Sequence, residues 1–108
     1  METVYRGYRN VSAKKLKKAG KTLFPAQMTA ITKVGVVYLG TLYDSTTYPD
    51  AFDWITRADE GIISFSLGVI PGIQIGRDKR AEIIVYAEDY VEGIVWGTLD
   101  IQVIDLGV

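Results

Sequence analysis

The residues best able to do chemistry are seven cationic side chains gathered in the first 21 positions. Five of them are lysines within residues 11–21, and two arginines precede these lysines. So much positive charge can neutralise phosphates, and Tyr5 and Tyr8 can stack on bases as aromatic residues do in nucleic-acid grooves. Lysine is also common on exposed edge strands, where it prevents edge-to-edge pairing. Both interpretations use the same candidate anion-binding or partner-binding residues: Arg6, Arg9, Lys14, Lys15, Lys17, Lys18 and Lys21.

The charge of the chain is divided unevenly between its two parts. Residues 1–21 hold seven basic residues and one acidic residue, a balance of +6, whereas residues 22–108 hold five basic and twelve acidic residues, a balance of −7. The sequence pI of about 5.3 is far below the values above about 9 that are typical of nucleic-acid-binding modules. The charge pattern therefore favours a solvated basic face, or one that meets the acidic body of a neighbouring copy.

Several kinds of catalytic and metal site are excluded by composition. The chain has no cysteine and no histidine, which removes disulfides, thiolate nucleophiles, histidine-based triads and the usual zinc ligands. The tripeptide Gly20-Lys21-Thr22 is not a phosphate-binding loop, because that motif requires a glycine where Lys15 stands. No catalytic set is recognisable, so the sequence predicts a protein that is not an enzyme and that has no cofactor.

Carboxylates gather in two predicted loops, where they can in principle hold calcium or hydrolyse a glycoside. Their spacing fits no calcium-loop template, and turn chemistry alone explains acidic residues at these places. We therefore predict no metal site in either loop. The two groups are Asp50, Asp53, Asp59 and Glu60, and Glu88, Asp89 and Glu92.

Aromatic residues offer one further chemistry, the stacking of a sugar ring. The alternative is that these rings belong to the core of the fold, and nothing in the sequence separates the two interpretations. The residues concerned are Phe52, Trp54, Tyr86 and Trp96.

The elements that must position these residues are mostly strands. Residues 62–68 place Ile63, Phe65 and Leu67 on one face, and the following Pro-Gly pair predicts a type II turn that begins at Ile70. The centre of residues 81–87 is apolar on both faces, as in an interior strand. Other strands are predicted within residues 29–45, 51–55 and 94–104.

Two segments leave finer questions. In residues 94–104 the apolar residues alternate with polar ones, and Trp96 falls in the polar register. Its ring is therefore either partly exposed at a sheet edge or packed under a loop. Residues 11–24 can form a two-turn helix capped by Ser12, or a hairpin whose arms are residues 14–18 and 21–24. The hairpin is favoured, because such a short helix would have little apolar surface to bury.

These elements predict a single domain over residues 1–108 with a basic N-terminal part, residues 1–21. Seven to nine short strands with turns between them are typical of an all-β fold, an antiparallel β-sandwich or a small barrel. The uncharged run from residue 61 to residue 76 contains two serines and a Pro-Gly break, so no membrane helix is expected. The N-terminus lacks the apolar segment of a signal peptide, which predicts cytoplasmic synthesis.

Several of these strands together resemble a family. Residues 29–104 are similar to small immunoglobulin-like β-sandwich proteins encoded by tailed bacteriophages and prophages. The shared features are a strand ending in Asp44-Ser45, the aromatic "FDW", the strand "GIISFSLG" at 61–68 and the hairpin "IIVYAEDYVEGIVWG". One departure is the pair Lys79-Arg80, where an aromatic residue often precedes the penultimate strand.

The resemblance implies an immunoglobulin-like antiparallel β-sandwich with a structural or assembly role in a virion. Its partners would be copies of itself or another virion protein. On this analogy the lysine stretch is the first hairpin of the sandwich. Two alternatives remain at this point: a polyanion-binding or nucleic-acid-binding domain that uses the seven basic residues, and a sugar-binding sandwich that uses Trp54 and Trp96.

Overall fold

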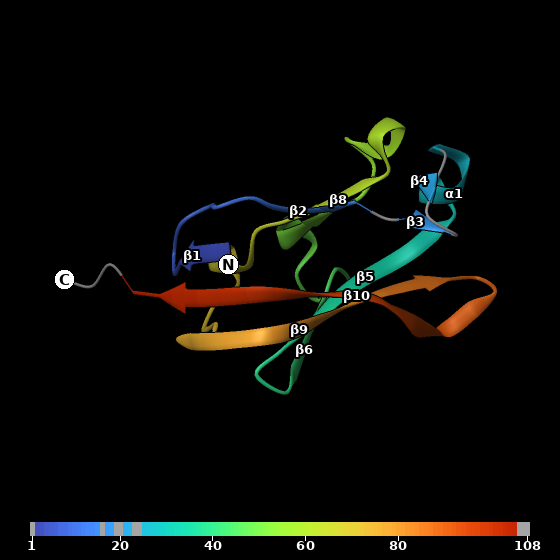
Figure 1. Cartoon of the computed structure of the whole chain (residues 1–108). Helices are drawn as coiled ribbons and strands as arrows, with labels where there is room; N and C mark the ends of the chain where they lie inside the picture. The colour runs from blue at the N-terminus through green and yellow to red at the C-terminus, as the bar shows by residue number, and fades with distance from the viewer. Residues whose placement is uncertain (1, 16, 19–20, 23–24, 106–108) are drawn as a thin grey trace.

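The structure of the protein is a computed structural model that describes residues 2–15, 17–18, 21–22 and 25–105. For residues 17–18, 21–22 and 25–26 it describes the backbone alone. Its larger sheet, here called sheet A, has the strand order β1-β10-β9-β5-β6 (Figure 1). These strands are β1 (Glu2–Tyr5), β5 (Ile31–Tyr38), β6 (Thr41–Asp44), β9 (Gly76–Ala87) and β10 (Tyr90–Ile104).

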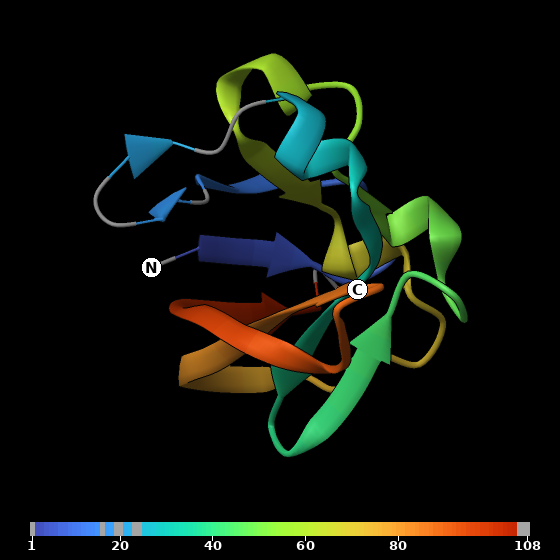
Figure 2. The ribbon, with the colours of Figure 1, turned by 90° about the vertical axis from the view of Figure 1, so that its right-hand side faces the viewer.

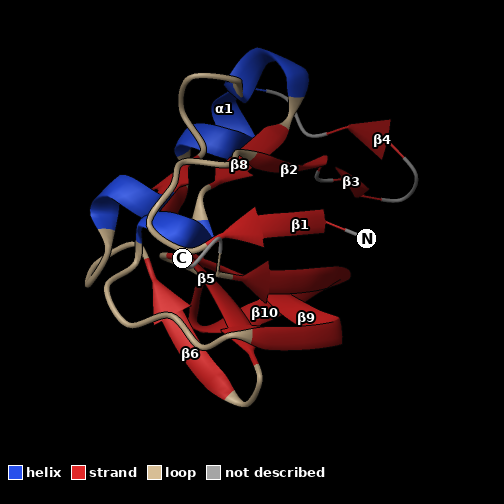
Figure 3. Ribbon diagram, turned by 90° about the vertical axis from the view of Figure 1, so that its left-hand side faces the viewer, coloured by secondary structure: helices blue, strands red, loops and turns tan. Residues whose placement is uncertain are grey.

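The second layer, sheet B, has the strand order β2-β8-β7 and lies on the opposite side of the core from sheet A (Figure 3). Two further short strands pair with each other as a separate two-stranded hairpin. The strands of sheet B are β2 (Ser12–Lys15), β7 (Phe52–Asp53) and β8 (Ile62–Phe65), and those of the hairpin are β3 (Lys17–Lys18) and β4 (Lys21–Thr22).

In the part of the chain that the structure describes, four short helical segments connect the strands. The α-helix α1 contacts η2, and the two lie beside each other in Figure 2. Each segment is only three to five residues long, too short to show a helical period in the sequence. They are α1 (Pro25–Thr29), η1 (Pro49–Ala51), η2 (Ala58–Glu60) and η3 (Leu67–Val69).

The hydrophobic core lies between the two sheets. Both layers contribute fully buried side chains, among them Ile83 and Ile101 from sheet A and Ile63 from sheet B. The prediction of an all-β sandwich is therefore confirmed. One pairing differs from a purely antiparallel arrangement, because β1 runs parallel to β10, with Glu2 beside Ile101 and Tyr5 beside Ile104.

The turn after β8 has the geometry that the sequence predicts. The N–H of Ile73 donates to the carbonyl of Ile70 (3.3 Å), and Gly72 has a φ of +73°, as the third residue of a type II turn requires. Ile63 and Phe65 are buried on one face of β8, as their alternation indicates. The interior position of β9, between β10 and β5, is confirmed as well.

The strict alternation predicted for residues 94–104 is wrong around Trp96. The register of β10 against β9 shifts between Val95 and Gly97: Val95 pairs with Ile84 and Gly97 with Ile83. Trp96 is thus the extra residue of a β-bulge, and its ring packs against the core. The strict alternation assumed for residues 94–104 breaks at this bulge, which leaves Val95 on the outer face and 54% exposed.

The basic segment forms strands instead of a helix. Lys17 pairs with Thr22 and Lys18 with Lys21, which gives the favoured hairpin over its central part. Its first arm is shorter than predicted, because Lys14 and Lys15 belong to β2 and pair with Ile63 and Ile62 of β8. The turn itself lies outside the described residues.

Candidate functional site

The described basic side chains of the N-terminal part make contacts within the same chain. The Arg6 guanidinium forms an ion pair with Asp105 (Nη2 to Oδ2, 2.7 Å). The Nη1 of Arg9 donates to the backbone carbonyl of Asp50 (3.1 Å). Both arginines therefore join distant parts of the chain, which makes their positive charges less available to bind a phosphate.

The lysines of β2 differ from each other in exposure. Lys14 is partly buried, and its Nζ lies 3.3 Å from the position that a Cβ would take on Gly97 of β10. Lys15 is exposed, and its charge adds to the larger effect of the Arg57 hydrogen bond in lowering the pKa of Glu60. The side chains of the other three candidates, Lys17, Lys18 and Lys21, lie outside the described residues. The seven predicted residues are therefore not shown to form one surface.

Two members of the first carboxylate cluster, Asp53 and Glu60, form hydrogen bonds with neighbouring residues of their own loop. The Asp53 carboxylate accepts from the N–H groups of Ile55 (2.9 Å) and Thr56 (3.0 Å) and from the Thr56 hydroxyl. The Glu60 carboxylate accepts two hydrogen bonds from the Arg57 guanidinium in a bidentate arrangement (2.9 and 3.1 Å). Within the described ranges, no three histidine, cysteine, aspartate or glutamate residues are grouped so that they could hold a metal ion.

Replacing Asp53 with alanine is expected to destabilise the fold by about 1 kcal/mol, because it leaves the turn donors without their acceptor. The Thr56 hydroxyl and backbone N–H bonds lower the pKa of Asp53 below 3.8. Its contribution is therefore present above pH 3.8 and is lost as the pH falls through the lower folded-state pKa. Urea unfolding at about pH 7 and about pH 3 measures the loss of unfolding free energy caused by Asp53→Ala, with Asp59→Ala as the exposed control. If Asp53→Ala lowers the unfolding free energy equally at both pH values, the ionised Asp53 carboxylate is not the group that stabilises this turn.

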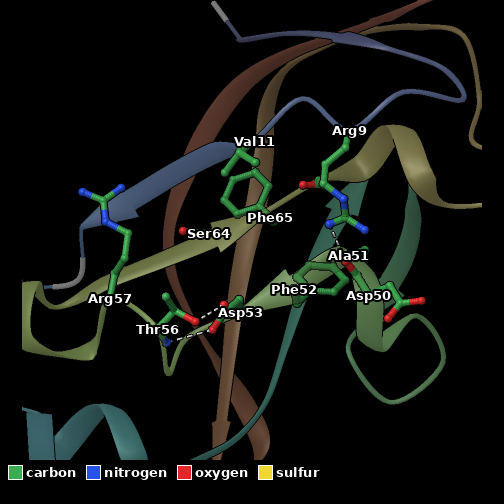
Figure 4. A pocket seen from close by; sticks show the side chains of 11 residues that line it. Arg9, Val11, Asp50, Ala51, Phe52, Asp53, Thr56, Arg57, Ser64 and Phe65 are labelled. Carbon is green, nitrogen blue, oxygen red and sulfur yellow. Dashed lines mark hydrogen bonds between the residues drawn. The ribbon is translucent and has the colours of Figure 1, made fainter.

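A hollow of about 230 Å³ lies on the side of sheet B (Figure 4). Its walls include the rings of Phe52 and Phe65, with Arg9 and Arg57 on opposite sides. It is smaller than the roughly 300 to 1,000 Å³ of most ligand pockets. The hydrogen bonds of both arginines and of Asp53 are directed to other residues of this chain, so these groups do not converge on a ligand.

The aromatic residues considered for sugar stacking do not share one surface. Trp54 donates from Nε1 to the carbonyl of Ile31 (3.1 Å), and both Trp54 and Trp96 pack against the core. Phe52 is buried, and Tyr86 lies on the outer face of sheet A, next to Gly93. A flat platform built from the two tryptophans is therefore not present.

The outer face of sheet A carries apolar side chains that sequence reasoning missed. Leu42 is 43% exposed and Val95 is 54% exposed on this face. Three partly buried residues complete the set, which we call the outer patch: Val37, Leu42, Ile84, Tyr86 and Val95. Among the described segments, none lies beneath this face in Figure 3. The signal was the two-faced apolar pattern of residues 81–87, which we interpreted as burial on both sides.

The N-terminal part of β10 also has an open edge. β1 pairs only with Ile101–Ile104, whereas β10 begins at Tyr90. Over Tyr90–Asp100, β9 is the only neighbouring strand in the part of the chain that the structure describes. The hairpin tip beyond this edge exposes Tyr90 (49%) and Val91 (76%). An exposed strand edge and an apolar tip are features that proteins use, or must protect, in association.

Comparisons with known proteins give no match: no protein-family model, curated protein sequence or solved structure matches this chain. Among the described residues, none of the helices has the length and apolar character needed to cross a membrane. The functional argument therefore depends on the surfaces of the molecule itself.

Proposed function

We propose that the protein is a non-enzymatic structural subunit of bacteriophage or prophage origin. It acts by self-association or by binding another virion protein. The observation that carries this proposal is the outer patch on sheet A. The phage origin is supported by the resemblance of residues 29–104 to the sandwich proteins of tailed phages, and it would place the protein in a virion.

The apolar patch favours assembly because the open face of an antiparallel sheet is ordinarily polar. Here Leu42 and Val95 are exposed, and Val37 and Ile84 lie between them on the two central strands. Covering such a face removes apolar surface from water, which is the main driving force of most protein association.

The basic N-terminal part contributes less to this proposal than its charge suggests. Arg6 already has Asp105 as its partner, and Arg9 is bound to the carbonyl of Asp50. The pairing of Lys18 with Lys21 does place two lysines side by side in the β3–β4 hairpin. That pairing is the observation in favour of the second function, the binding of a polyanion.

Size-exclusion chromatography with light scattering tests the assembly function at roughly 50 mM and 500 mM salt, a range that screens exposed charges. We expect the protein to form an oligomer that persists at the higher salt, because apolar contacts are not screened. Dissociation at the higher salt would indicate a contact between the basic part and an acidic neighbour. A monomer at both salts that binds a labelled DNA oligomer at the lower salt would support the polyanion alternative and contradict the self-association part of the assembly function.

A further inference from the structure

Four of the five residues of the outer patch lie in two neighbouring rows that cross sheet A, and the fifth, Tyr86, lies in the next row beside Lys33. The first row runs from β6 to β10 through Asp44, Gly35, Ile84 and Val95, each paired with the next. The second row contains Leu42, Val37, Glu82 and Thr98; it lies two residues along β6, β5 and β9, and three along β10 because of the bulge at Trp96. The patch therefore extends continuously over four strands.

The conformation of the patch is fixed by close contacts. The side chain of Leu42 covers Gly35, where a Cβ would lie 2.9 Å from Cδ1 of Leu42. Gly93 lies beneath Ile84 and Tyr86, because a Cβ there would lie 2.6 Å from Cγ2 of Ile84 and 2.7 Å from Cε1 of Tyr86. Glycine at both positions lets large side chains lie flat across the sheet, which gives a smooth apolar surface.

Two opposite charges are placed symmetrically about the first row. On one side Lys33 pairs with Tyr86, and on the other side Val37 pairs with Glu82. Lys33 and Glu82 are each two residues from the row, about 7 Å along the strands. The Nζ of Lys33 lies 4.2 Å from the centre of the Tyr86 ring, which keeps this cation on the outer face.

This placement is complementary to a second copy of the same face. A two-fold axis along the Gly35–Ile84 row reverses the strand direction and leaves the positions along the row unchanged. Asp44, at the β6 end of the row, therefore meets its own counterpart at the edge of the contact, where each carboxylate accepts from the N–H of Thr47 (2.8 Å). Lys33 of one copy then lies beside Glu82 of the other, and the symmetry makes this contact twice. Ile84 meets its own counterpart near the axis, where the apolar contact is most completely shielded from water.

We propose that the outer face of sheet A binds the same face of a second copy, with a two-fold axis along the Gly35–Ile84 row. This inference rests on the proposed assembly function and names its partner. The two facing sheets pack about 10 Å apart, as in a β-sandwich. The occupant is a second copy because Lys33 and Glu82, the charges on the two sides of the row, are matched to each other.

Two arginine substitutions test whether the patch is the contact. Val95→Arg and Leu42→Arg place a charge at exposed positions that the monomer tolerates, and each is expected to weaken the dimer at least roughly tenfold. Ile55→Arg is the matched control, since Ile55 is 56% exposed and lies beyond β7 of sheet B. Sedimentation velocity measures the dimer dissociation constant, and circular dichroism shows that each variant is folded.

A charge exchange tests the identity and the orientation of the partner. Lys33→Glu and Glu82→Lys are each expected to be monomeric, because each variant places like charges together twice. An equimolar mixture of the two variants is expected to restore the dimer as a heterodimer, since the carboxylate introduced at position 33 of one copy then faces the ammonium introduced at position 82 of the other. Sedimentation of one fluorescently labelled variant with the other unlabelled detects this species.

The outcomes separate this interface from the assembly function. A wild-type oligomer that withstands all four substitutions overturns the interface and leaves assembly standing through another surface, such as the open edge of β10. Weakening by Val95→Arg and Leu42→Arg without recovery in the mixture overturns the two-fold orientation. A wild type that is monomeric at high concentration overturns the interface and the self-association part of the function together.

Discussion

Replacing Gly68 with alanine is expected to destabilise the protein by about 3 kcal/mol, the upper end of the usual cost of overpacking. A Cβ at this position would clash with the carbonyl oxygen of Tyr8 and would lie 2.5 Å from that of Tyr5. These are backbone atoms, so no side-chain rotation relieves the clash. The neighbouring backbone is also fixed, because the N–H of Gly7 donates to the carbonyl of Gly68 (2.8 Å).

Thermal and urea unfolding measure this effect, and Gly72→Ala is the matched control. Gly72 has a φ of +73° with nothing within 4 Å of its Cβ position, so alanine there adds backbone strain of about 1 kcal/mol without a clash. If Gly68→Ala costs no more than Gly72→Ala, the close packing of the N-terminal segment on η3 is wrong. An effect that is much larger at Gly68 supports it.

The contrast between these two glycines shows what the sequence reveals of this fold. The role of Gly72 follows from the preceding Pro71, because a Pro-Gly pair specifies a type II turn locally. The role of Gly68 depends on Tyr5 and Tyr8, which lie far earlier in the chain. Local backbone chemistry was therefore predictable, whereas the contacts between distant segments were not.

The difference between local signals and distant contacts also explains why the sequence did not show that the candidate basic residues have partners within the chain. Their charge was evident from the sequence, but the ion pair of Arg6 with Asp105 joins residues 99 positions apart. Trp96 shows a related difficulty, since one extra residue in a ladder changes the face of every side chain before it. Gly97 lies at this bulge, and a glycine inside a strand often marks one, but the glycine alone does not say which residue is the extra one.

The outer patch was visible in the sequence but was interpreted differently. Residues 81–87 are apolar on both faces, and such a strand is usually covered on both sides. The structure places Ile83 and Val85 in the core and leaves Ile84 and Tyr86 on the outer face. The pattern is thus consistent with a strand whose second face is covered only on association.

The adjacent residues Ile83 and Ile84 allow the two faces to be compared directly. Ile83→Ala is expected to lower the free energy of unfolding by about 2–5 kcal/mol, because the side chain is fully buried and its removal leaves a cavity. Ile84→Ala is expected to cost about 1 kcal/mol or less, because its side chain lies on the outer face. Urea unfolding at the lowest workable protein concentration measures both, since association then contributes least.

The two substitutions should have the opposite order of effect on association. Folded Ile83→Ala protein keeps the outer face, so its dimer dissociation constant should stay close to that of the wild type. Ile84→Ala removes the side chain nearest the proposed axis from both copies, so it should weaken the dimer while the monomer stays folded. If Ile84→Ala destabilises the monomer as much as Ile83→Ala does, then Ile84 belongs to the core of the single chain, and the outer face of sheet A is not the surface on which assembly depends.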